Sequence, residues 1–188
     1  MTSHKPWRSM ILGRRMTRRG ATVLLVGVNI GLMLAWSIAS LADSIPTRLY
    51  TIPSNSMAPT IAAGDRVGVQ SRSNPRPNRG EIWVFNLPAA PTQPTVTLVK
   101  RVIGLPGEKV EVANGAVRID GRILEEPYIT GLIRYTMPPI DLGSNEYFML
   151  GDSRNTSQDS HIWGPLPRSH FIGPVTVRVW PLKRVGGL

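Results

Sequence analysis

Residues 95–103 read Thr-Val-Thr-Leu-Val-Lys-Arg-Val-Ile, and this stretch decides the fold class. β-Branched and aliphatic residues, which favour a pleated and half-buried chain, fill almost all of it. Because side chains alternate between the two faces of a strand, Lys100 shares its face with Leu98 and Val102. We therefore predict a strand here, with one lysine among aliphatic side chains.

Lys100 has two interpretations at this point. A lysine on an aliphatic face can carry its ammonium group out to solvent on a flexible stem. If the side chain is buried instead, its pKa falls from about 10.4 towards neutrality, and the neutral amine can act as a general base. The strand alone leaves both interpretations open.

The pattern around this strand predicts further strands and little helix. Asn114-Gly115 joins two β-forming runs, which is the strongest short-range signal for a hairpin. The 18 glycines and 17 prolines follow no repeat and supply many turns. Further strands are expected over residues 66–69, 81–85, 109–113, 116–119, 147–150 and 174–180, with a polar loop over 151–164 and a fraying tail after 180. The predicted fold class is therefore mainly β.

An apolar segment precedes this β-rich part of the chain. Residues 21–42 carry no charged side chain, and about 20 residues at about 1.5 Å each span a hydrocarbon core of about 30 Å. Residues 1–20 are basic and contain no Asp or Glu, which places them in the cytoplasm by the positive-inside rule. We predict a basic cytoplasmic segment over 1–20, one transmembrane anchor over 21–42 and a β-rich domain over 43–188 on the extracytoplasmic face.

A cleavable signal peptide is the alternative for residues 21–42. Ser40-Leu41-Ala42 resembles the small-x-small pattern at which such peptides are cut. The apolar run is longer than the roughly 7–15 residues of an ordinary signal-peptide core, which favours a retained anchor.

The net charge of +10 could indicate a nucleic-acid partner. Six of the basic residues lie in residues 1–20, so most of the excess charge precedes the apolar segment. The remainder of the chain shows no basic stripe, helix-turn-helix pattern or RNA-binding aromatic motif. We therefore expect no nucleic-acid partner.

Several kinds of catalytic or metal site are excluded by what the sequence lacks. The absence of cysteine rules out disulfides, thiolate catalysis and cysteine-ligated zinc. The chain has neither a Gly-x-Ser-x-Gly elbow nor a His-Glu-x-x-His zinc motif. The loop beginning at Asp152 fails as a calcium loop, because Ser157 and Trp163 stand where glycine and glutamate are needed. No metal or other cofactor is expected.

A serine-rich turn follows the apolar segment. Residues 51–60 read Thr-Ile-Pro-Ser-Asn-Ser-Met-Ala-Pro-Thr, and their two prolines exclude a helix interior. The stretch can be a plain Ser/Pro linker, or a stiff turn that presents Ser54 and Ser56 on one side. In the second case a neutral Lys100 could take the proton of a serine hydroxyl, as in a Ser-Lys dyad. The Ser54 hydroxyl and the Ser56 backbone N–H could then bind the oxyanion.

Four sequence blocks resemble those of the type I signal peptidases, the membrane-bound serine proteases that remove secretory signal peptides. The blocks occur in the same order as in that family and are distributed over nearly the whole chain. The blocks are PSNSMAPTIAAGD at 53–65 behind the apolar segment, RGEIWVF at 79–85, KRVIGLPGE at 100–108 and GDSRNTSQDSHIWGPLP at 151–167. Within the last block, residues 159–167 resemble the cyanobacterial and plastid branch of the family.

The resemblance implies a role for each site residue. Ser56 would be the nucleophile, Lys100 the general base and Ser54 the oxyanion donor. We predict separately that Arg101→Met leaves activity largely intact. Ser157 would orient the Lys100 amine. Asp152, Arg154 and Asp159 would structure the loop as supports rather than take part in the chemistry. Shallow pockets for small side chains would be lined by Ile52, Pro53, Met57, Leu98 and Val99.

Two positions depart from the pattern of many bacterial relatives. Ser153 stands where those relatives have asparagine, and His161 stands where they have arginine. The second change removes a fixed positive charge beside Asp159, so the ion pair of that aspartate is in question. Neither change affects Ser56 or Lys100.

The resemblance also implies a fold and an activity. The fold would be a coiled antiparallel β-sheet catalytic domain behind one N-terminal transmembrane helix, with an apolar surface on the lipid bilayer. The activity would be cleavage of preprotein signal peptides after a small-x-small site, at the plasma membrane or the thylakoid. The alternative from a different class is a catalytically silent, membrane-anchored β-domain that binds exported peptides. A self-cleaving repressor is disfavoured because the chain has an anchor in place of a DNA-binding domain.

Overall fold

The structure is a computed structural model that describes residue 33, residues 46–87 and residues 94–188. The predicted cytoplasmic segment lies outside the described residues, as does the predicted anchor apart from Met33. No helix within the described part of the chain is both long enough and apolar enough to cross a membrane. The chain divides into two units, residues 1–43 and 44–188, and every strand named here belongs to the second unit.

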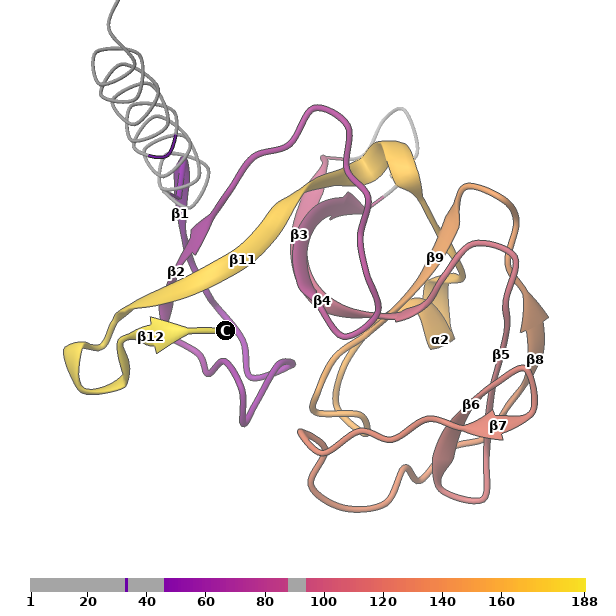
Figure 1. The fold of residues 1–188 in the computed structure, drawn as a ribbon. Coiled ribbons are helices and arrows are strands. Elements are labelled where there is room, and N and C mark those ends of the chain that lie inside the picture. Colours follow the sequence, from indigo (N-terminus) through magenta and orange to yellow (C-terminus); the bar gives the residue numbers. More distant parts are fainter. Residues whose placement is uncertain (1–32, 34–45, 88–93) are drawn as a thin grey trace, which may run out of the picture. The chain divides into compact units, whose positions relative to one another are not determined.

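The second unit is built from two antiparallel sheets, which confirms the mainly β prediction (Figure 1). The larger sheet has the strand order β1-β2-β11-β3-β4-β9-β10, with β12 also paired to β11. Its strands are β1 (Arg48–Thr51), β2 (Arg66–Val69), β3 (Ile82–Leu87), β4 (Val96–Gly104), β9 (Glu146–Leu150), β10 (Leu166–Pro167), β11 (Phe171–Trp180) and β12 (Gly186–Gly187).

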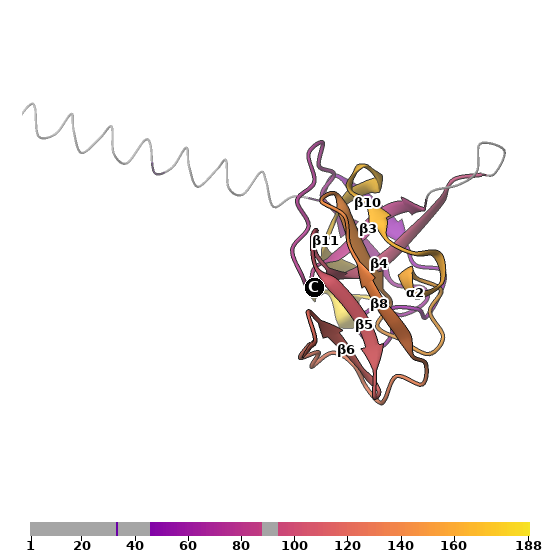
Figure 2. The same cartoon turned by 90° about the vertical axis from the view of Figure 1, so that its right-hand side faces the viewer.

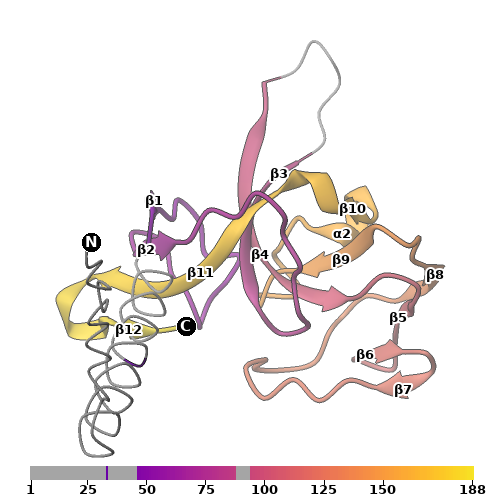
Figure 3. The same ribbon diagram turned by 45° about the horizontal axis from the view of Figure 1, so that its top comes forward.

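The smaller sheet has the order β7-β6-β5-β8 and lies at the opposite end of the domain from β1, β2 and β12 (Figures 1 and 3). Figure 2 shows the domain from the side of β5 and β8. The strands of this sheet are β5 (Lys109–Ala113), β6 (Ala116–Ile119), β7 (Arg122–Ile123) and β8 (Met137–Asp141). Three short helical segments complete the domain: α2 (Ser160–Trp163), η1 (Arg168–His170) and η2 (Leu182–Arg184).

The hairpin between β5 and β6 forms where the sequence predicts it. Asn114 and Gly115 have φ values of 54° and 77°, the left-handed pair that a two-residue hairpin turn requires. The strand predicted from residues 95–103 is β4, and it pairs with β3 on one side and β9 on the other. The strand that contains Lys100 therefore lies in the interior of the larger sheet.

Three expectations about the rest of the chain were wrong in detail. The polar loop contains one turn of helix, α2, whose N-cap Asp159 accepts a hydrogen bond from the His161 backbone N–H. β11 begins at Phe171, before Pro174. The tail after Trp180 does not fray, because β12 pairs with the free edge of β11. β8 was not predicted, because it contains Pro138 and Pro139. The two prolines are tolerated because this strand lies at a sheet edge.

One of the three hydrophobic clusters anchors the serine-rich turn to the larger sheet. Ile52 and Met57, on either side of the two serines, are buried with Ile61, Val67 and Val84. Burial of two such side chains contributes about 1.5–3 kcal/mol each relative to leaving them exposed. Residues 52–57 therefore belong to the packed domain and are not a linker.

Candidate active site

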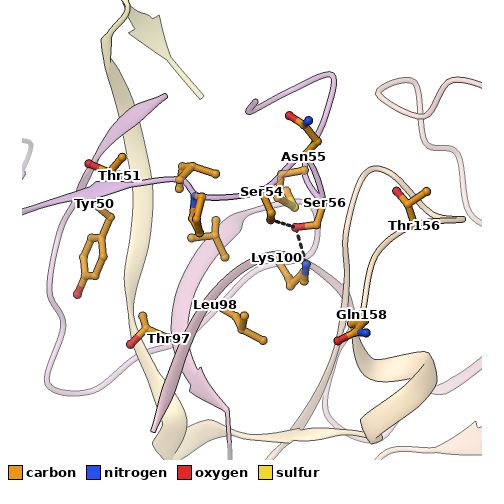
Figure 4. Close-up of a pocket in the computed structure, with 14 residues that line it drawn as sticks. Tyr50, Thr51, Ser54, Asn55, Ser56, Thr97, Leu98, Lys100, Thr156 and Gln158 are labelled. Atoms are coloured by element: carbon orange, nitrogen blue, oxygen red, sulfur yellow. Dashed lines mark hydrogen bonds between the residues drawn. The ribbon is translucent and has the colours of Figure 1, made fainter. Parts of the chain in front are cut away.

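Lys100 on β4 is buried, and its amine meets the serine-rich turn (Figure 4). Its Nζ lies 2.7 Å from Ser56 Oγ, within hydrogen-bonding distance. Only 3% of the residue is exposed, so the snorkelling interpretation was wrong. Burial lowers the pKa of Lys100, while the charges of Asp159 and Asp152 act in the opposite direction. The amine is therefore neutral over a wider pH range than that of an exposed lysine, as a general base requires.

The two serines of the turn point towards each other. Ser54 Oγ lies 3.3 Å from Ser56 Oγ and donates to it, so three polar atoms form a row from Ser54 through Ser56 to Lys100 (Figure 4). The turn itself is held by backbone hydrogen bonds from Ala58 N–H to Asn55 C=O and from Ile61 N–H to Met57 C=O. The Ser56 hydroxyl is thus attached to a fixed backbone.

Residues 151–154 form a tight turn against the backbone of Ser56. The Ser153 N–H donates to the Ser56 carbonyl at 3.1 Å. A Cβ on Gly151 would lie 2.5 Å from that carbonyl oxygen and 2.2 Å from Ser157 Oγ, so only glycine permits this approach. The Thr60 hydroxyl donates to Asp152 Oδ2 at 2.5 Å, a second link between the two turns.

Ser157 is buried beside Gly151, and its Oγ has no hydrogen-bond partner among the described residues. In this structure it makes no hydrogen bond to Lys100. Its proposed role in orienting the amine stays a prediction.

Asp159 keeps a partner despite the histidine at position 161. His161 Nδ1 lies 2.5 Å from Asp159 Oδ1, and the ring of Tyr135 stacks on the imidazole with a centroid separation of 4.3 Å. The second carboxylate oxygen of Asp159 accepts from the Gly151 N–H at 2.9 Å. Asp159 therefore keeps a hydrogen-bonded partner at position 161, with histidine in place of arginine.

Two buried arginine–carboxylate pairs support the 151–154 turn. Arg101 donates to both oxygens of Asp152 at 2.9 and 2.6 Å, and Arg154 donates to both oxygens of Glu126 at 2.7 and 2.5 Å. Nothing in the sequence pattern singled out Glu126. Arg101 is only 8% exposed and also donates to the Gly80 carbonyl, whereas its dispensability for activity stays a prediction.

A cavity of about 670 Å³ opens beside the Ser56–Lys100 pair. All five predicted substrate-binding residues line it, namely Ile52, Pro53, Met57, Leu98 and Val99. The polar residues Asn55, Thr156 and Gln158 also line it, and these were not predicted (Figure 4). In the part of the chain that the structure describes, no group of three His, Asp or Glu side chains could hold a metal ion.

Substitution of Arg101 is expected to destabilise the domain strongly. Arg101→Met leaves the fully buried Asp152 carboxylate without its partner, which costs about 3–5 kcal/mol of unfolding free energy. For a domain of this size the midpoint of thermal unfolding should fall by on the order of 10 °C, as measured by circular dichroism. Lys109→Met is the matched control, because Lys109 pairs with Asp141 at the surface and its loss should cost less than about 1 kcal/mol. Equal unfolding midpoints for the two variants would contradict the buried pair.

The known proteins to which this chain is similar include signal peptidases and a thylakoidal processing peptidase. Residues 25–180 match the family model "Signal peptidase, peptidase S26". Signal peptidase I of Leptolyngbya laminosa is 46% identical over 144 residues, which is 73% of this chain and 70% of that protein. The probable signal peptidase I-2 of Synechocystis sp. is 42% identical over 72% of this chain and 64% of its own length. The probable thylakoidal processing peptidase 2 of Arabidopsis thaliana is 34% identical over 73% of this chain and 39% of its own length.

Proposed function

Because this chain belongs to the signal peptidase family, peptidase S26, we propose that it is a membrane-bound serine endopeptidase that removes signal peptides from exported preproteins. The identities with cyanobacterial and chloroplast proteins confirm the branch that residues 159–167 indicated. The observation that carries the proposed mechanism is the 2.7 Å separation between the buried Lys100 amine and Ser56 Oγ.

The proposed reaction is acyl transfer to Ser56 followed by hydrolysis. Neutral Lys100 takes the proton of the Ser56 hydroxyl as Oγ attacks the carbonyl carbon of the scissile bond. The Ser54 hydroxyl and the Ser56 N–H stabilise the oxyanion. Lys100 then protonates the leaving amine, which leaves the signal peptide as an ester on Ser56. A water molecule deprotonated by Lys100 attacks this ester, and Lys100 returns the proton to Ser56 Oγ as the signal peptide leaves.

The substrate segment is a short extended stretch with small side chains. Support comes from the cavity beside the dyad, whose walls include the buried Ile52 and Met57 and the half-buried Leu98 and Val99. We propose that the small side chains of the substrate pack against these apolar walls. The domain would work on the extracytoplasmic face behind the anchor proposed for residues 21–42, with the N-terminus in the cytoplasm.

The identity of the cleaved bond tests this function. Purified full-length protein in detergent is expected to cut a preprotein after a small-x-small site. Replacement of the residue before the bond by leucine or phenylalanine should lower kcat/KM by about 100-fold or more. N-terminal sequencing of the product and the rates for the paired substrates provide the measurement.

Two outcomes would contradict the proposal. Equal cleavage of the small and bulky substrates would remove the signal-peptide specificity. Tight binding of the preprotein without cleavage by folded wild-type protein would favour the silent peptide-binding domain.

A further inference from the structure

The segment that follows β7 contacts both arginines that support the 151–154 turn. From this segment Glu126 binds the Arg154 guanidinium through two hydrogen bonds, and only 8% of its side chain is exposed. The ring of Tyr128 lies under Arg101, with the guanidinium carbon 3.8 Å from the ring centroid. Two residues outside the sequence blocks of the site therefore contact its supporting arginines.

These contacts close a ring of interactions. The Tyr128 hydroxyl donates to Glu126 at 2.8 Å, which joins the two halves of the segment. Arg154 donates through Nε to the Gly151 carbonyl at 3.0 Å, and Arg101 holds Asp152. Gly151 and Asp152 are consecutive, so each arginine fixes one residue of the turn that holds the Ser56 carbonyl.

The Tyr128 hydroxyl is suited to a hydrogen bond to Glu126 that does not change with pH. Burial, with a further contribution from the charge of Glu126, raises the pKa of the Tyr128 hydroxyl well above its usual range. The phenol therefore stays protonated and remains a hydrogen-bond donor to Glu126 at every pH at which the enzyme would work. The aromatic face meanwhile stabilises the Arg101 cation through a cation–π contact.

We propose that Tyr128 and Glu126 are positioning residues of the catalytic centre, which hold Arg101 and Arg154 so that the 151–154 turn keeps Ser56 and Lys100 in register. This inference rests on the proposed peptidase function. Neither residue touches the reacting atoms, and each acts through an arginine.

Loss of the Tyr128 ring has a consequence for Lys100 that simple destabilisation does not have. The charged groups that act on Lys100 are Asp159 and Asp152, and Arg101 neutralises Asp152. Without the ring, Arg101 is held less firmly and neutralises Asp152 less completely. A less neutralised Asp152 favours the protonated form of Lys100, so the pKa of Lys100 rises.

The pH dependence of cleavage tests the proposal. kcat/KM should rise with pH as Lys100 loses its proton. In Tyr128→Leu and Tyr128→Met this rise, the acidic limb of the pH profile, should occur at a pH about 0.5–1 unit higher than in the wild type. At pH values below the limb, kcat/KM should therefore be roughly 3–10-fold lower than that of the wild type. Tyr128→Phe keeps the aromatic face over Arg101 but loses the hydrogen bond to Glu126, so its limb should lie between those of the wild type and Tyr128→Leu. Full-length proteins in detergent and one preprotein are used throughout.

Val117→Ala separates positioning from stability. Val117 is fully buried in the core of the smaller sheet, so its truncation lowers the unfolding temperature without touching the ring. Its acidic limb should coincide with that of the wild type. Limbs of Tyr128→Leu and Tyr128→Met that also coincide with the wild type would overturn the proposal. Failure of both variants to fold would assign Tyr128 to stability alone and would overturn it as well. Absence of cleavage by the folded wild type would instead reject the proposed function.

Discussion

Replacement of Lys100 by methionine is expected to abolish cleavage while the domain stays folded. Methionine has nearly the length of lysine and fills the same buried space, but it cannot take the Ser56 proton. Loss of the general base should lower kcat by a factor of about 10⁴ or more. The rates of preprotein cleavage by the wild type and by the variant provide the measurement. Lys109→Met removes an exposed lysine and should retain activity.

The same variant should unfold at a higher temperature than the wild type. Burial lowers the pKa of Lys100, so between the folded and unfolded pKa values the unfolded chain binds more protons than the native one. Stability of the wild type therefore rises with pH through this window and is lowest below the folded pKa. The advantage of Lys100→Met should be greatest at low pH and should shrink as pH rises. Cleavage at the wild-type rate by Lys100→Met would remove the general-base assignment.

Replacement of Ser56 by alanine is the second substitution with a very large expected effect. It deletes the attacking oxygen and should also lower kcat by about 10⁴-fold or more. The hydrogen bond from the Ser153 N–H uses the Ser56 carbonyl, which alanine retains, so the circular dichroism spectrum should not change.

Ser54→Ala provides the comparison for the nucleophile. It removes only one oxyanion donor and should cost about 10²–10³ in kcat. A folded Ser54→Ala that is less active than Ser56→Ala would exchange the roles of the two serines.

Local patterns predicted much of the fold. Alternation along β4 placed Lys100 on an aliphatic face, and Asn114-Gly115 placed the β5–β6 hairpin. Strands such as β8, with two prolines, could not be found locally, because their pairing at a sheet edge depends on the partner strand.

The supports of the site depend on contacts between distant parts of the sequence. Arg101 meets Asp152 across 51 residues, and Glu126 meets Arg154 across 28. A strand pattern shows which face carries Arg101, but it does not show which carboxylate is opposite. Burial of Lys100 likewise follows from the packing of the whole sheet. The family motifs predicted the Ser-Lys pair, and only the structure brings Glu126 and Tyr128 to the two supporting arginines.

The most direct test of the central claim is to locate the covalent intermediate. Wild-type protein is mixed with a preprotein, quenched in acid within the first turnover, digested and mapped by mass spectrometry. The account predicts the signal peptide joined as an ester to the fragment that carries Ser56, and no such adduct in Ser56→Ala or Lys100→Met. An ester on a different residue, or turnover by folded Ser56→Ala, would contradict it.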